Sequence, residues 1–185
     1  MDPLISALIP QASGDVQSRI AEVLGRFSQA ILHRVAEAKA IVRPLKGAEL
    51  YTEASPALRR LGIDVDAWPA PPAGLFVVEE RTVYLRSCSP MTIAHEFGHA
   101  IDCALGGGAY LSGIDPEIRR AFVDAGSFVT PYAATGIDEY FAEAVRAYVE
   151  VNDHGSSWPQ ASKARLKRVD PTMFHIVESL IGCTT

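Results

Sequence analysis

The alternation of hydrophobic and polar positions along the chain predicts a mostly helical protein. Between residues 15 and 40, apolar residues recur at intervals of three and four, which is the pattern of one long amphipathic helix. The apolar positions of this stripe are Val16, Ile20, Val23, Leu24, Phe27, Ile31, Leu32 and Val35. A second, shorter helix is expected over residues 55–61.

Three further helices are predicted from their start signals, each of which is a serine or aspartate followed by proline. The pairs Ser89-Pro90, Asp115-Pro116 and Asp170-Pro171 combine an N-capping side chain with a proline suited to the first helical position. The first of these helices should end at the three glycines at positions 106–108. The other two should end near positions 125 and 180.

Two short strands, at residues 74–78 and 82–85, are predicted on either side of Glu79-Glu80-Arg81, which makes them a tight hairpin. The proline-rich residues 68–72 before them form a stiff extended connector. The second strand leads directly into the helix that begins at Ser89, and an exposed strand edge can pair with an extended peptide. The expected fold class is therefore α+β, mostly helical, with a small sheet beside that helix.

Length and composition suit one globular domain. The chain has 185 residues, of which 48% are hydrophobic and 21% charged, so a substantial core can form. We divide this domain into an N-terminal helical part (1–72), a central core (73–152) and C-terminal helices (153–185). The formal net charge of −5 argues against nucleic acid as a partner, and the basic run at 163–168 is interpreted as a solvated helix face.

The chain is expected to be cytoplasmic and to have no membrane as a partner. Its N-terminus begins with an acid and has only a short apolar stretch, and no run approaches the length of a membrane span. The three cysteines, Cys88, Cys103 and Cys183, are odd in number and widely separated, which favours reduced thiols over a disulfide framework. Export by a dedicated secretion system stays open as an alternative.

The segment that indicates chemistry is His95-Glu96-Phe97-Gly98-His99. Residues four apart share one face of a helix, so His95 and His99 can direct ring nitrogens at one metal ion. Glu96 then lies beside the open coordination position, which is the HExxH arrangement of zinc peptidases. The ordinary alternative is a pair of structural helix histidines around a solvated glutamate.

Two acidic residues are candidates for a third ligand. Asp102 shares the helix face of the histidines, but its short side chain starts about 4.5 Å beyond His99 along the axis, which favours a supporting or capping role. Residues 136–149 have helical periodicity with an acidic first turn, so a second helix could carry Glu139 across the site. Glu139 is therefore the preferred third ligand.

At this point the sequence resembles a known family. The segment HEFGHAID at 95–102, followed by Tyr132 and by EYFAEA at 139–144, is similar to the catalytic domain of anthrax lethal factor and to the Pro-Pro endopeptidases. A looser likeness extends to the Mlc titration factor peptidases. In this group a tyrosine precedes the third zinc ligand, a glutamate, by seven residues, as Tyr132 precedes Glu139. The family usually has phenylalanine where this chain has Tyr140.

The resemblance implies a zincin-like metallopeptidase domain that holds one Zn²⁺ ion and cleaves a protein or peptide substrate. His95, His99 and Glu139 would hold the zinc, and Glu96 would act as general base. Tyr132 would donate a hydrogen bond to the oxyanion of the tetrahedral intermediate. Asp102 and Glu143 are candidates to accept the second N–H group of a ligating histidine, or are solvated helix charges.

Two functional hypotheses from different classes follow. The first is a zinc endopeptidase, and the second is a zinc-holding interaction module that has kept the fold without turnover. The presence of Glu96 and Tyr132 favours the first, because neither residue is needed to bind metal. A purely structural helical protein is the third interpretation.

Overall fold

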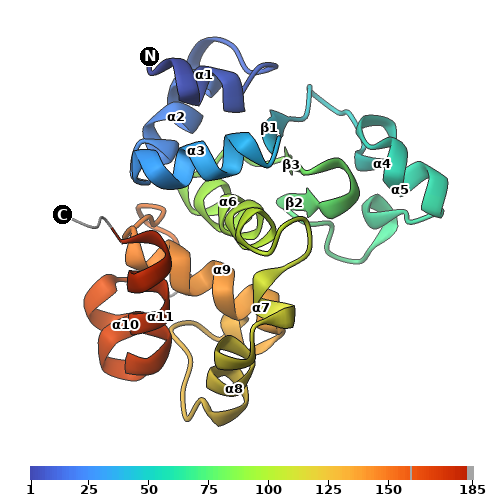
Figure 1. Cartoon of the computed structure of the whole chain (residues 1–185). Helices are drawn as coiled ribbons and strands as arrows, with labels where there is room; N and C mark the ends of the chain where they lie inside the picture. Colours follow the sequence, from blue (N-terminus) through green and yellow to red (C-terminus); the bar gives the residue numbers. More distant parts are fainter. Residues whose placement is uncertain (159, 183–185) are drawn as a thin grey trace.

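The computed structural model describes residues 1–158 and 160–182 and has an α+β fold that is mostly helical, as predicted (Figure 1). In chain order its α-helices are α1 (Pro3–Leu8), α2 (Gly14–Leu24), α3 (Gln29–Glu37), α4 (Tyr51–Ala54), α5 (Pro56–Leu61), α6 (Pro90–Leu105), α7 (Leu111–Ile114), α8 (Pro116–Asp124), α9 (Ile137–Tyr148), α10 (Lys163–Val169) and α11 (Pro171–Ile181). Three short 3₁₀ helices are η1 (Val65–Ala67), η2 (Val78–Glu80) and η3 (Tyr132–Ala134). None of the helices in the described residues is long and apolar enough to cross a membrane.

The sheet has three strands in the order β1-β3-β2, where β1 is Ile41–Pro44, β2 is Gly74–Val77 and β3 is Thr82–Leu85. The predicted hairpin is confirmed, because β2 and β3 pair antiparallel with Phe76 opposite Val83. The turn between them differs slightly from the prediction, since Val78 belongs to η2 rather than to the strand. Strand β1 was not predicted; it pairs parallel with β3, so β2 is an edge of the sheet.

The prediction of one long helix over residues 15–40 is wrong. Two helices, α2 and α3, occupy this region, separated by a break at residues 25–28. Ser28 starts the second helix by accepting a hydrogen bond on its hydroxyl from the amide of Ile31. Phe27 lies within the break but is buried in the core, so the apolar periodicity continues across a point where the backbone is not helical.

Helix α6 is the centre of the molecule. The Ser89 hydroxyl caps it by accepting from the amide of Thr92 at 3.2 Å, and Pro90 occupies the first turn, as the sequence predicts. Helices α2 and α3 and the sheet pack on one side of α6, and α9 packs on the other (Figure 1). Residues 93–104 of α6 are all buried, which is why this helix lacks a polar outer face.

One hydrophobic cluster joins the early and late parts of the chain around α6 and α9. It runs from Ile5 in α1 to Ile181 in α11 and includes Phe97 and Phe141 from the two central helices. A second, smaller cluster lies under α4 and α5, where Tyr51 and Leu58 pack against Tyr84 of the sheet. The central helices are thus held by packing from nearly every other element.

Helices α6 and α9 approach each other most closely at Gly98. A Cβ atom added to Gly98 would lie 3.0 Å from the Cα atom and 3.2 Å from the Cβ atom of Ala142. Small residues on both helices therefore set the separation of the two helix axes at this point. This separation matters for function because the residues one turn away, His95 and Glu139, face each other across the same interface.

A larger side chain at this contact should destabilise the fold. We expect Gly98→Val to lower the free energy of unfolding by about 1 to 3 kcal/mol, the typical cost of overpacking a core. Gly113→Val is the matched control, because Gly113 is exposed, and a Cβ atom added to it meets nothing within 4 Å. Urea unfolding of both variants measures the difference, and an equal loss at the two positions would contradict the packing argument.

Candidate functional site

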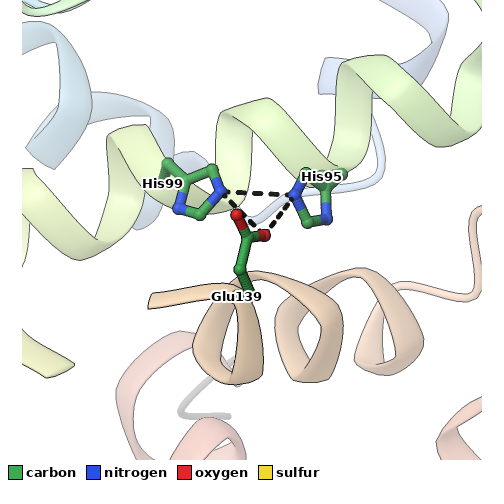
Figure 2. A group of neighbouring side chains, drawn as sticks. All are labelled: His95, His99 and Glu139. Atoms are coloured by element: carbon green, nitrogen blue, oxygen red, sulfur yellow. Dashed lines mark hydrogen bonds and ion pairs between the residues drawn. The ribbon is translucent and has the colours of Figure 1, made fainter. Parts of the chain in front are cut away.

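Three side chains converge between the two central helices. His95 and His99 extend from α6 towards Glu139, which extends from the first turn of α9 (Figure 2). The Nε2 atoms of the two histidines are 3.2 Å apart. Oxygen Oε2 of Glu139 lies 2.9 Å from His95 Nε2 and 3.4 Å from His99 Nε2. The three potential ligand atoms therefore form one small triangle, as expected for residues that share a metal ion.

The dimensions of this triangle fit a tetrahedral zinc ion. Ligand atoms at about 2.0 to 2.1 Å from a tetrahedral zinc lie about 3.3 Å from one another, close to the three separations between these atoms. Within the described residues, Glu139 Oε2 is buried, and its polar contacts are with the imidazole nitrogens of His95 and His99. Two imidazole nitrogens and a carboxylate oxygen are ligand types that zinc takes, so the donor set is suited to this cation.

The second ring nitrogen of His95 is held by a buried carboxylate. His95 Nδ1 lies 2.9 Å from Glu143 Oε1, so an N–H on Nδ1 can donate to it and leave Nε2 facing the triangle. The hydroxyl of Thr130 donates to the other Glu143 oxygen at 2.5 Å. Glu143 itself is 2% exposed, so it is not a solvated helix charge.

Arg146 completes this support, and the sequence analysis did not single it out. It is fully buried, and its Nε and Nη2 atoms donate to the two oxygens of Glu143 at 2.9 Å each. The remaining nitrogen, Nη1, donates to the carbonyl of Val151 and to Asn152 Oδ1. The only signal in the sequence is the three-residue spacing from Glu143, which occurs often on solvated helices.

The opposite charges of His95 and Glu139 shift the pKa values of both. Burial by itself lowers the pKa of His95, but the carboxylates of Glu139 and Glu143 outweigh burial and raise the pKa to about 10. Burial raises the pKa of Glu139, but its contacts with His95 and His99 outweigh burial and hold that pKa well below its usual range. The carboxylates of Glu139 and Glu143 therefore favour a positive charge at this position.

Glu96 lies beside the triangle and against the sheet. It is 8% exposed, and burial raises the pKa of its carboxyl group, while the nearby His95 and His99 act in the opposite direction. A Cβ atom added to Gly74, the first residue of β2, would lie 2.4 Å from Glu96 Cγ. Only glycine at this position allows the edge strand to approach the carboxylate so closely, and the sequence analysis missed this role of Gly74.

Tyr132 comes from η3, in the segment before α9, and contacts two of the three residues of the triangle, His95 and Glu139. Its ring centroid is 5.4 Å from that of His95, and its hydroxyl donates to Glu139 Oε1 at 3.2 Å. Tyr132 is 39% exposed and lines a cavity together with His95 and Glu96. Burial, and then the charge of Glu139, raise the pKa of Tyr132, which keeps the hydroxyl protonated as a donor.

Asp102 faces a different partner from the one that the sequence analysis considered. Its carboxylate is fully buried and accepts hydrogen bonds from the amide of Ser112 at 2.8 Å and from its hydroxyl at 2.6 Å. These bonds tie the last turn of α6 to α7. Burial raises the pKa of Asp102 to about 6, even though the bonds from Ser112 lower it. Among the described residues, Nδ1 of His99 has no hydrogen-bond partner.

The remaining described histidines and cysteines lie outside this cluster. His33, His154 and His175 are exposed, which agrees with their absence from the predicted site. Cys88 and Cys103 are free thiols, as expected. Cys183 lies outside the described residues.

The fold is similar to that of a solved peptidase. The chain superimposes on the Pro-Pro endopeptidase PPEP-2 from Paenibacillus alvei with a TM-score of 0.68 and 20% sequence identity. The match covers 96% of this chain and 100% of that protein. At this identity the likeness establishes a shared fold, which agrees with the predicted α+β, mostly helical fold class. No protein-family model and no curated protein sequence matches the chain.

Proposed function

We propose that the protein is a zinc-dependent endopeptidase. The observation that carries the proposal is the triangle formed by His95, His99 and Glu139, with the separations of tetrahedral zinc ligands and with Glu96 buried beside it. The fold shared with PPEP-2 supports peptide-bond hydrolysis as the reaction, because that protein is an endopeptidase. The substrate would then be a protein or peptide.

The three ligand residues would hold one zinc ion per chain. A zinc ion held there would supply a Lewis acid that activates the attacking water and polarises the peptide carbonyl. Coordination would need a neutral imidazole of His95 with Nε2 free to face the ion. Glu143, held by Arg146, would keep that imidazole in one tautomer and orientation.

Glu96 would act as the general base. Its carboxylate takes a proton from the attacking water and passes it to the nitrogen of the leaving amine. Burial raises the pKa of Glu96, which brings the carboxylate nearer to the basicity that proton transfer at neutral pH requires. Gly74 leaves the edge of β2 close to this carboxylate, so an extended substrate paired with β2 would pass directly over the reacting groups.

Tyr132 would stabilise the oxyanion that forms after water attacks the carbonyl. Its hydroxyl is 3.2 Å from a Glu139 oxygen, so it would lie close to a substrate carbonyl held beside the three ligand residues. The hydrogen bond would then act on a charge that is present only after attack, so it affects the rate more than substrate binding.

Zinc binding is the first test. We expect the purified protein to bind one zinc ion, and His95→Ala, His99→Ala and Glu139→Ala each to abolish stoichiometric binding. His175→Ala is the matched control, because His175 is an exposed helix residue outside the cluster. Elemental analysis and calorimetric titration after chelation measure the stoichiometry. Retention of tight binding by Glu139→Ala would disprove the proposed third ligand.

Replacing the base separates metal binding from catalysis. We expect Glu96→Gln to keep zinc and melting temperature and to lose peptide hydrolysis, because an amide cannot accept the proton. Cleavage of a peptide library by wild type and variant, read by mass spectrometry, gives the comparison. Equal cleavage would exclude Glu96 as the base. A zinc-loaded wild type that cleaves nothing would favour the alternative, a catalytically silent zinc-binding module.

Removal of the Tyr132 hydroxyl should lower the rate selectively. We expect Tyr132→Phe to reduce kcat by about 10² to 10³, with KM and zinc affinity nearly unchanged, since one oxyanion donor is lost and the ring is kept. If the hydroxyl is only structural, stability falls instead by about 1 to 3 kcal/mol and kcat is unchanged. Melting temperature, zinc content and kcat measured on one preparation distinguish these outcomes.

A further inference from the structure

A cavity of about 240 Å³ opens directly beside the general base and lies between the sheet edge and the segment that follows α9. Glu96, His95 and Tyr132 border one side of it. Gly74 at the start of β2, Met91 in the first turn of α6, and Trp158 also line it. Trp158 is not among the residues that the sequence predicted for the site, and it lies in a segment to which no function was assigned.

Trp158 is positioned against the catalytic cluster. Its ring lies edge-on to that of Tyr132, with centroids 6.1 Å apart and an interplanar angle of 72°. Trp158 is 39% exposed, so its ring is accessible to a substrate. Trp158 thus lines the cavity next to Tyr132.

The segment that carries Trp158 is fixed to the same framework that supports the metal ligands. Asn152 accepts from Arg146 and, through its amide group, exchanges two hydrogen bonds with Ala161 on the far side of the segment. Asp153 accepts from the amide of Met91 at 2.8 Å and so ties the segment to the first turn of α6. The wall formed by Trp158 is therefore braced at both ends.

The chemistry of the cavity favours an apolar occupant. Three of its walls are the thioether of Met91, the indole of Trp158 and the proline-rich turn before β2, and no lysine or arginine of the described chain lines it. An acidic side chain would enter next to the carboxylates of Glu96 and Glu143, and no basic side chain among the lining residues could pair with it, which makes its burial costly. The volume is below the roughly 300 to 1,000 Å³ of pockets that enclose drug-sized ligands, so it suits one side chain.

We propose that this cavity is the substrate pocket that selects an uncharged, apolar side chain next to the scissile bond, and that Trp158 is its specificity-determining wall. The proposal rests on the proposed endopeptidase function and adds the substrate class to it. The substrate side chain would pack against the indole, while the peptide backbone pairs with the edge of β2.

The test compares substrate preference between wild type and Trp158→Ala. A peptide library identifies a cleaved sequence, and matched peptides then carry leucine, alanine or glutamate at each position flanking the bond. At one position we expect wild type to prefer leucine over alanine, and we expect Trp158→Ala to lower that kcat/KM ratio by about 10-fold. The glutamate peptide should remain a poor substrate for both. Trp158→Phe keeps an aromatic wall and should preserve most of the preference.

Trp68→Ala is the matched control, because Trp68 is the other tryptophan, is also exposed, and does not line the cavity. It should leave the leucine-to-alanine ratio unchanged. An unchanged ratio in Trp158→Ala overturns the proposal, as does an equal change in kcat/KM for every peptide, which would mean that Trp158 affects access and not selection. Zinc content and melting temperature verify that each variant is folded.

A second measurement separates failure of this proposal from failure of the proposed function. If zinc-loaded wild type cleaves no peptide, calorimetry with the hydroxamates of acetyl-leucine and acetyl-alanine still probes the pocket, because the hydroxamate group binds zinc. Tighter binding of the leucine compound, by about 10-fold, that is lost in Trp158→Ala supports the pocket without turnover. Equal affinities of the two hydroxamates for wild type overturn the pocket.

Discussion

The close packing of α6 against α9 is the constraint on which the rest of the structure depends. Gly98 and Ala142 let the two helices meet at a distance that larger residues would not allow. One turn along, the same separation places Glu139 within 2.9 and 3.4 Å of the histidine nitrogens. A shift of the helices by one ångström would open the triangle beyond the span of a single small cation.

Charge balance is the second consequence of this packing. Glu96, Glu139 and Glu143 are brought close to one imidazole in a region from which water is largely excluded. Arg146 neutralises Glu143 through two hydrogen bonds and, being fully buried, is itself paired by that carboxylate. The two remaining carboxylates face the histidines, so a divalent cation in the triangle would relieve more of the buried negative charge than one proton can.

The network around Arg146 also links parts of the site that are distant in sequence. Through Glu143 it orients His95, and through Asn152 it fixes the segment that carries Trp158. The proposed metal centre and the proposed substrate pocket therefore share one rigid support. Such support matters because misplacing a reacting group by about one ångström can cost a large part of a catalytic rate.

The sequence by itself determined the elements whose signals are local. Proline after Ser89, Asp115 and Asp170 located three helix starts, and the spacing of His95 and His99 placed two imidazoles on one helix face. Tertiary structure decided what depends on contacts between distant segments. The pairing of β1 with β3, the break between α2 and α3 despite a continuous apolar stripe, the bonding of Asp102 to Ser112, and the burial of Arg146 all belong to this class. Periodicity records which side of the chain is buried but not which segment covers it, and so it could not reveal these features.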